Sequence, residues 1–427
     1  MSAITAKASR KMKKYAVLTR EPRCFLGSFD FSWEQRKLSE ITDKVTEKNA
    51  GLQYVETFTN SAEFGIISQR DFFDHDIAKL GSLDGYYIVK TEDFVYNPRI
   101  STSAPVGPIN RNKLGRTGVM SPLYTVFRPH DIDTTYLEYF FKCGYWHSFM
   151  NFNGDSGARS DRFSIRDNVF FQMPIPIPDI DEQRKIGELL TCLDNLITLH
   201  QRKFEKLTNV KKSMLEKMFP QNGSSYPEIR FKGFTDPWEQ RKLGDIGETY
   251  TGLSGKTKAD FGHGQARFVT YMNVFSNPIS NPEMTEPIEI DPKQNEVEVG
   301  DVLFTTSSET PEEVGMSSVL LEKRGKTYLN SFCFGFRPSE KIDSYYLAYM
   351  LRSESAREKI ILLAQGISRY NISKNKVMEI AVSLPSLDEQ KLIGQYFRQL
   401  DHLITLHQRE LEKLQNIKKS MLEKMFV

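Results

Sequence analysis

The sequence predicts an α/β (α+β) protein with two domains in pseudo-symmetric tandem, joined by two long antiparallel helices that form a coiled coil. Three observations lead to this prediction. A long helix-forming stretch occurs twice, its apolar residues recur with heptad spacing, and the segments before the two copies share little sequence. With 427 residues, the chain is long enough for two or more domains with separate cores.

The internal repeat has two parts. WEQRKLSEI at 33–41 returns as WEQRKLGDI at 238–246, an offset of 205 (238 − 33). Residues 181–219 return at 388–426, an offset of 207 (388 − 181), and 27 of the 39 aligned positions are identical. The period is therefore about half the chain, which indicates a tandem duplication.

The segments between the repeats, 42–172 and 247–379, share only a skeleton. Its matching pieces are EDFVYN (92–97) with GDVLFT (300–305), FRP at 127–129 and 336–338, the expected helices 133–142 and 343–352, and Arg162 and Ile165 with Arg369 and Ile372. Duplication with uniform drift is the simpler alternative, but it would not leave the helices so much more alike than the domains. The pattern favours two domains that do the same job on different targets.

Each long helix is expected to begin after a proline-bearing stretch, near Asp181 and Asp388. Apolar residues then recur at alternating spacings of four and three, which is a heptad seam. Four polar residues interrupt the seam, and we expect them to set register rather than to catalyse: His200, His407, Lys211 and Lys418. Two domains held apart by such a helical pair would act as a caliper.

The expected boundaries follow from these patterns. Residues 1–21 form a basic leader, which we expect to be disordered. The first domain is expected at 22–180, the first connecting helix at 181–219, the second domain at 220–387 and the second helix at 388–427.

The sequence offers no site for chemistry. The four cysteines form no CxxC motif and no metal-ligand cluster, which is typical of a protein of the reducing cytoplasm. No NPPY-type, Walker or GxGxxG motif is present, and no apolar run has transmembrane length. Asp179, Glu182 and Arg184 resemble a nuclease carboxylate cluster only faintly, and Ser386 stands at the place of Asp179 in the second copy. Acids at a helix start are the better interpretation.

Basic residues collect in runs without Asp or Glu, although the net charge is only +2. Such runs lie at 94–130, 261–282, 323–339 and 359–378. One run alone is more often a solvated face, but runs in both halves favour contact with DNA, which needs cationic donors. The candidate DNA-binding residues are Arg99, Arg111, Lys113, Arg116, Arg159, Arg162, Lys256, Lys258, Arg267, Lys326, Arg369, Lys374 and Lys376.

The domain opening PEIRFKGFTDPWEQRKL (227–243), its weaker counterpart FDFSWEQRKL (29–38) and the helix endings NVKKSMLEKMFP and NIKKSMLEKMF form a specific combination. From about Pro22 to Val427, the chain resembles the specificity (S) subunit of bacterial type I restriction-modification systems.

The resemblance implies two target-recognition domains, each reading one half of a bipartite double-stranded DNA site. It also implies helical regions that bind two methyltransferase (M) subunits, to which restriction (R) subunits are added. S-adenosylmethionine, ATP and Mg would bind to those partners. The resemblance implies no membrane partner and no catalytic activity of this chain. Two alternatives remain from the residues alone: a coiled-coil scaffold with two protein-binding domains, and an enzyme with an unrecognised site.

Overall fold

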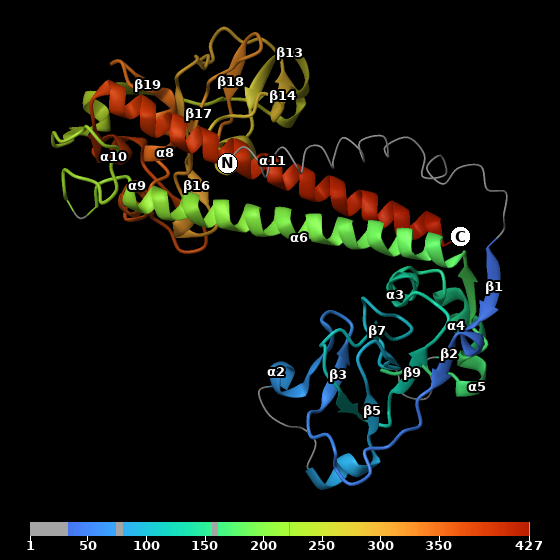
Figure 1. Cartoon of the computed structure of the whole chain (residues 1–427). Coiled ribbons are helices and arrows are strands. Elements are labelled where there is room, and N and C mark those ends of the chain that lie inside the picture. Colours follow the sequence, from blue (N-terminus) through green and yellow to red (C-terminus); the bar gives the residue numbers. More distant parts are fainter. Residues whose placement is uncertain (1–32, 74–79, 156–160, 222, 427) are drawn as a thin grey trace. The chain divides into compact units, whose positions relative to one another are not determined.

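The computed structural model describes residues 33–73, 80–155, 161–221 and 223–426 (Figure 1). The leader expected at 1–21 and the candidate Arg159 lie outside the described residues.

The chain divides into two compact units, each built from segments far apart in the sequence. Unit 1 comprises residues 1–199 and 411–427, and unit 2 comprises residues 200–410. The long helices α6 (Ile180–Lys217) and α11 (Leu387–Met425) each contribute one segment to each unit. The units therefore differ from the expected division into domains and helices, because each unit includes the end of the helix that belongs to the other repeat.

A short antiparallel ladder opens and closes the domain of unit 1. β1 (Glu34–Lys37) pairs with β10 (Pro174–Ile177), so that WEQRKL lies beside the proline-bearing stretch. Proline cannot donate a ladder hydrogen bond, and a two-stranded ladder has room for it because each strand is an edge. Leu38 and Ile41, which follow β1, are fully buried.

The main sheet of unit 1 has the antiparallel order β2-β9-β6-β7. Its strands are β2 (Thr42–Lys44), β9 (Thr125–Pro129), β6 (Phe94–Tyr96) and β7 (Ile109–Arg111). Phe94 stacks on Phe127 on one face, at 5.6 Å between ring centroids, whereas Val95 and Val126 join a second apolar cluster. Alternate residues thus bury both faces of the sheet.

Shorter elements complete unit 1 (Figure 1). They are the hairpin β3 (Phe58–Ser61) and β4 (Gly65–Ser68), the ladder β5 (Tyr87–Val89) and β8 (Gly118–Met120), and the helices α2 (Gln69–Phe73), α3 (Thr134–Lys142), α4 (His147–Asn153) and α5 (Asp167–Phe170).

Unit 2 repeats the ladder and the main sheet. β11 (Glu239–Lys242) pairs with β21 (Ala381–Leu384), and the sheet order is β12-β19-β15-β17. Its strands are β12 (Gly247–Thr251), β19 (Cys333–Pro338), β15 (Val302–Thr305) and β17 (Ser317–Val319). The sheet skeleton inferred from EDFVYN/GDVLFT and the two FRP motifs is therefore present, with both pairs of motifs on corresponding strands.

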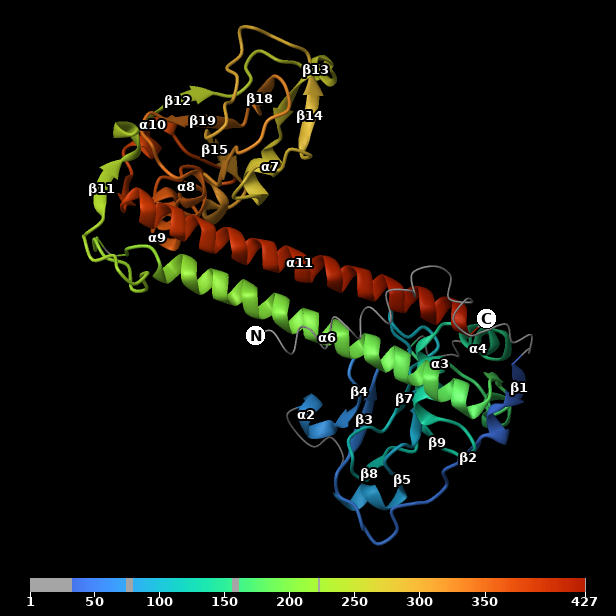
Figure 2. The same cartoon turned by 45° about the horizontal axis from the view of Figure 1, so that its top comes forward.

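The additions to this core differ from those of unit 1 (Figure 2). They are a sheet of β14 (Thr285–Ile288), β13 (Phe261–Val269) and β18 (Thr327–Leu329), the pair β16 (Ser307–Ser308) and β20 (Tyr370–Asn371), and the helices α7 (Tyr271–Ser276), α8 (Ser344–Met350), α9 (Glu354–Ile361) and α10 (Lys374–Met378).

Both long helices begin close to the expected residues. The Oδ1 atom of Asp179 accepts hydrogen bonds from the backbone N–H groups of Asp181 and Glu182, at 3.0 and 2.9 Å. These bonds satisfy amides that have no partner inside the helix. Asp179 is therefore the cap of α6, in keeping with its interpretation as a helix-start acid.

In each unit, aromatic rings bury the end of one long helix. Phe426, just after α11, packs on Tyr136 and Phe140 of α3, with ring centroids 5.5 and 5.8 Å away. Phe219, just after α6, packs on Tyr346 and Phe397 at 5.8 Å. Phe219 and Phe426 occupy the same position in the repeat, so the motif MLEKMF anchors a helix to the domain of the other repeat.

Residues of the expected seam also bring the two helices together within each unit. Leu190 and Leu193 of α6 share the core of unit 1 with Leu414 and Met421 of α11. In unit 2, Met214 of α6 and Met218, just after it, lie in one cluster with α11 residues such as Leu400. The segments run antiparallel in each unit, because the start of one helix meets the end of the other.

Within the described ranges, no helix combines the length and the hydropathy that a bilayer crossing requires.

Candidate nucleic-acid interface

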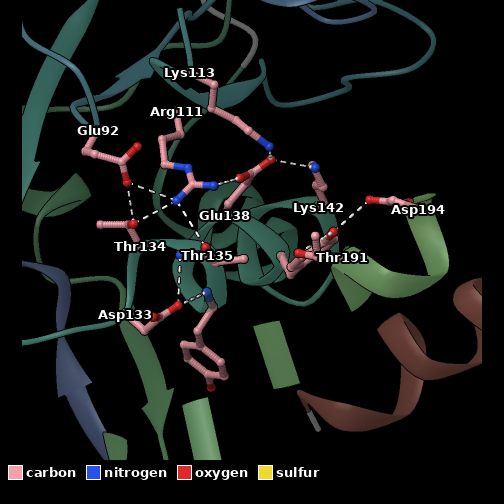
Figure 3. A network of polar contacts seen from close by, with 12 residues as sticks. Glu92, Arg111, Lys113, Asp133, Thr134, Thr135, Glu138, Lys142, Thr191 and Asp194 are labelled. Atoms are coloured by element: carbon pink, nitrogen blue, oxygen red, sulfur yellow. Dashed lines mark hydrogen bonds and ion pairs between the residues drawn. The ribbon is translucent and has the colours of Figure 1, made fainter. Parts of the chain in front are cut away.

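Arg111 is the most enclosed of the candidate residues. Its guanidinium lies between Glu92, at 3.0 Å, and Glu138, at 2.5 Å, and it also donates to the hydroxyls of Thr134 and Thr135 (Figure 3). Only 8% of its side chain is exposed. Burial opposes ionisation of Glu138, but Lys142, Arg111 and Lys113 lower its pKa below the ordinary value. Arg111 therefore holds β7 to α3, and this arrangement gives no support to its prediction as a DNA contact.

Four other candidates also have their donors engaged. Arg116 binds both carboxylate oxygens of Glu56, and this hydrogen bond lowers the pKa of Glu56. Lys113 pairs with Glu138 at 3.3 Å, and Lys256 pairs with Asp291 at 2.8 Å. The hydrogen bond from Lys256 lowers the pKa of Asp291 to about 2. Arg267 donates to the hydroxyl and carbonyl oxygens of Thr285.

These pairs correct the premise behind the acid-free runs. The runs lack acids along the chain, but folding brings carboxylates to them from other segments. The arginines of the two FRP motifs show the same effect: Arg128 binds Asp93 through two hydrogen bonds of 2.7 and 2.8 Å, and Arg337 binds Asp301 at 2.9 and 2.8 Å. Asp93 and Asp301 are 1% exposed, so these bonds fasten β9 and β19.

The other candidates within the described ranges make no ion pair and no side-chain hydrogen bond with described residues. They are Arg99 and Arg162 in unit 1, and Lys258, Lys326, Arg369, Lys374 and Lys376 in unit 2. Arg369 is exposed and lies over the ring of Phe332, 5.5 Å from its centroid, which holds the guanidinium by a cation–π contact. These seven residues are the cations best placed to meet an anionic ligand.

Arg162 and Arg369 are not equivalent in space, although the sequence aligns them. The N–H of Phe163 donates to the carbonyl of Pro98, and the N–H of Ile372 donates to that of Thr306. Pro98 and Thr306 hold the same position, five residues after Asp93 and Asp301. Arg162 therefore corresponds to Asn371, and Arg369 lies two residues earlier. The two segments share so few residues that their sequences do not reveal this two-residue shift in the alignment.

A triad from three segments joins each domain to the helices. In unit 1, Asp194 of α6 accepts a hydrogen bond from the Tyr139 hydroxyl at 2.7 Å and pairs with Lys418 of α11 at 2.5 Å (Figure 3 shows Asp194). In unit 2, Asp401 of α11 accepts from Tyr349 at 2.8 Å and pairs with Lys211 of α6 at 2.5 Å.

The triads explain why lysines occupy two positions of the heptad seam. Lys211 and Lys418 were expected to set register, and each meets an aspartate at the same place in the other helix. Heptad spacing located the lysines but missed Asp194 and Asp401, which lie outside the apolar positions. The repeat contained the signal, because both aspartates and both lysines recur at the offset of 207 (401 − 194 and 418 − 211).

Among the described residues, no group of three or more His, Cys, Asp or Glu side chains is arranged to hold a metal ion.

Comparison with known proteins gives one consistent family. The family model described as the type I restriction modification DNA specificity domain matches residues 32–209 and 235–416. The MjaVIII specificity subunit and the putative MjaX specificity subunit, both from Methanocaldococcus jannaschii, are 24% and 25% identical to this chain. Those matches cover 60% and 61% of this chain and 61% and 60% of the relatives, so the chain spans less than two thirds of their length.

A crystal structure of a type I restriction-modification S subunit from M. genitalium shares the fold. It has a TM-score of 0.51 and 14% sequence identity, over 94% of this chain and 98% of that one.

Proposed function

Because the chain belongs to the family of type I restriction-modification DNA specificity proteins, we propose that it selects the DNA sequence for such a system. Each unit reads one half of a bipartite double-stranded site, and the chain itself carries out no catalysis. A DNA target places the protein in the compartment that holds the chromosome. The scaffold alternative has no support from the family match.

One observation carries this proposal. Both units have the same ladder and sheet order, but they add different elements to this core. Unit 1 adds the hairpin of β3 and β4 and the ladder of β5 and β8, whereas unit 2 adds the sheet of β14, β13 and β18. A shared framework with different additions is suited to reading two different half-sites, because base readout depends on a few donors and acceptors.

The most direct test is an electrophoretic mobility shift with the full chain and its co-expressed methyltransferase. We expect selection, from mixed-sequence duplexes, of a motif made of two short sequences with an unread spacer. Selection of a single continuous motif would contradict the bipartite proposal, and an absence of DNA binding would contradict the function itself.

The helices should recruit two methyltransferase subunits, with restriction subunits added to that core. S-adenosylmethionine, ATP and Mg would bind those partners. Leu199 and Leu406, which are equivalent in the repeat, are 46% and 45% exposed on α6 and α11. Equal exposure of a large apolar residue at equivalent positions supports two copies of one docking surface.

Substitution at these leucines tests the stoichiometry. Leu199→Asp and Leu406→Asp should each remove one methyltransferase from the complex, and the double variant should remove both, as measured by native mass. A wild-type complex that saturates with one methyltransferase would overturn the proposed stoichiometry.

The helical pair should also set the spacer between the half-sites. An insertion of four residues adds about one helical turn and about 6 Å, or roughly two base pairs of B-DNA. The repeat suggests insertions at Leu207–Asn209 and Leu414–Asn416, but these positions do not face each other. His200 contacts His407, so the partners of Leu207 precede His407 in α11.

Insertions after Leu199 and after Glu410 are the better design, because these are the boundaries of the units and the contacts within each unit are kept. We expect unchanged half-sequences with a longer spacer. If the spacer and the affinity both stay the same, the helices only dock the partners.

A further inference from the structure

Arg99 and Arg162 face each other across an isolated antiparallel bridge in unit 1. The N–H of Phe163 donates to the carbonyl of Pro98 at 2.7 Å, and the N–H of Ile100 donates to that of Asp161 at 3.0 Å. These two bonds flank the bridge, so the arginines form a non-hydrogen-bonded pair. In such a pair the side chains leave the same face, with Cβ atoms about 4.5–5.5 Å apart.

This arrangement costs stability unless an anion is bound. Like charges directly opposite each other on neighbouring strands repel. Three of the five described candidates of unit 1 have a carboxylate partner: Arg111, Lys113 and Arg116. Among the described residues, Arg99 and Arg162 have no ion pair or side-chain hydrogen bond to offset the repulsion.

Unit 2 has no such pair at the corresponding place. Ser307 and Asn371 take the positions of Arg99 and Arg162, and they pair through β16 and β20. Ser307 is 3% exposed. The fold therefore does not require two cations at this bridge, and their presence in unit 1 is a property of that domain alone.

The charge of the pair favours a phosphate over a base edge. Arg162, but not Arg99, also lines a groove of about 470 Å³, whose walls include Tyr124 and the ion pair of Lys44 with Asp167. A phosphodiester brings the negative charge that two opposed guanidiniums lack, whereas the edge of a guanine offers acceptors without a net charge.

We propose that Arg99 and Arg162 form a clamp that binds one DNA backbone phosphate, and that unit 2 lacks this clamp. The inference rests on the proposed DNA-binding function and adds a specific contact to it. The clamp contributes affinity and position for the first half-site without reading its sequence, since phosphate contacts are the same for every base pair.

Salt dependence of binding tests the clamp without knowledge of the target sequence. The full chain, with its co-expressed methyltransferase, is titrated with mixed-sequence duplex DNA over about 50 to 200 mM salt. For Arg99→Gln/Arg162→Gln, the slope of log K against log[salt] should become shallower by about 1, the value for one lost phosphate contact. The matched control Arg116→Gln removes a cation that Glu56 already engages, and it should change the slope less.

A second measurement separates loss of contact from loss of folding. Arg162→Gln relieves the repulsion, so its melting temperature without DNA should equal or exceed that of the wild type. A lower melting temperature together with an unchanged slope would assign the pair a structural role and overturn the clamp.

Two further outcomes also decide the question. Variants that keep the wild-type slope but accept altered bases in the first half-site would show that the pair reads a base, and the phosphate clamp would be wrong. A wild-type complex that binds no DNA would instead overturn the proposed function.

Discussion

The two units join sheet to helix in the same framework by different chemistry. In unit 1, Glu138 of α3 binds Arg111 of β7, and Lys142 closes the network. Unit 2 has Ala348 and Val319 at the places of Glu138 and Arg111, both buried. At the place of Lys142, Arg352 donates to the backbone carbonyls of Ser317, Val274 and Phe275. Burial lowers the pKa of Arg352 to about 10, so it is still protonated at neutral pH.

This difference separates the contacts that belong to the framework from those that belong to one domain. The triads Tyr139–Asp194–Lys418 and Tyr349–Asp401–Lys211 are the same in both units. The contacts between the main sheet and the first helix after it differ: Glu138 binds Arg111 in unit 1, and the buried Ala348 and Val319 take their places in unit 2. A different domain can therefore fit the same framework if it provides a tyrosine that donates to the aspartate of the long helix. The sheet of that domain must also pack against the first helix that follows it.

The largest effect is expected from breaking the ionic junction of unit 1. Glu138→Ala leaves the buried Arg111 with Glu92 as its one carboxylate among the described residues and should lower the free energy of unfolding by about 3 kcal/mol. The double variant Glu138→Ala/Arg111→Val copies unit 2 and should recover most of that loss, since an apolar pair can replace a buried ion pair. Chemical denaturation of the full chain measures both. A double variant as unstable as the single one would mean that the two junctions are not interchangeable.

A smaller and equal effect is expected from the framework tyrosines. Tyr139→Phe and Tyr349→Phe each remove one hydrogen bond to an aspartate that also binds a lysine, and each should cost about 1 kcal/mol. Thermal unfolding of the two variants side by side gives the comparison. If the losses of stability in the two variants differ by more than twofold, the triads are not equivalent parts of one framework.

The smallest effect is expected where the two helix copies meet at their histidines. The Nδ1 atoms of His200 and His407 lie 3.1 Å apart. Burial lowers the pKa of both rings, and for His407 the neighbouring His200 and Lys203 lower it further, while Glu410 partly opposes the effect at His200. The unfolded chain then binds protons more readily than the folded one, so stability falls as pH drops below the ordinary histidine value of about 6.5.

Unfolding experiments between about pH 5 and 8 test this prediction. His407→Leu should make the pH dependence shallower, whereas the control His402→Leu, at an exposed position of the same helix, should leave it unchanged. The buried His147, whose pKa is also lowered, accounts for the part that remains. A pH dependence as steep in His407→Leu as in the wild type would rule out a contribution from the histidine pair.

Sequence patterns located the framework well because its signals are local and occur twice. The proline stretches and acidic first turns located the starts of α6 and α11 within one residue, Ile180 for Asp181 and Leu387 for Asp388. Two copies of one helix also indicated that the helices pair with each other.

The candidate site was predictable only in part, because its chemistry depends on contacts between distant segments. Arg111 and Glu138 are 27 residues apart (138 − 111), and no local pattern links them. Arg99 and Arg162 were identified as single cations, but their pairing required the bridge between two loops. The acid-free runs failed as a criterion for the same reason, since Glu56 and Asp301 reach those runs only in the folded chain.

The central claim is that each unit reads its own half-site on a shared framework. The direct measurement is methylome sequencing of cells that carry this chain with residues 247–379 exchanged for those of a relative, co-expressed with the methyltransferase. The exchange keeps β11, β21 and both long helices, and it replaces the domain of unit 2. We expect one half of the methylated sequence to change, while the other half and the spacer stay the same. A change in both halves would contradict separate reading by the two units.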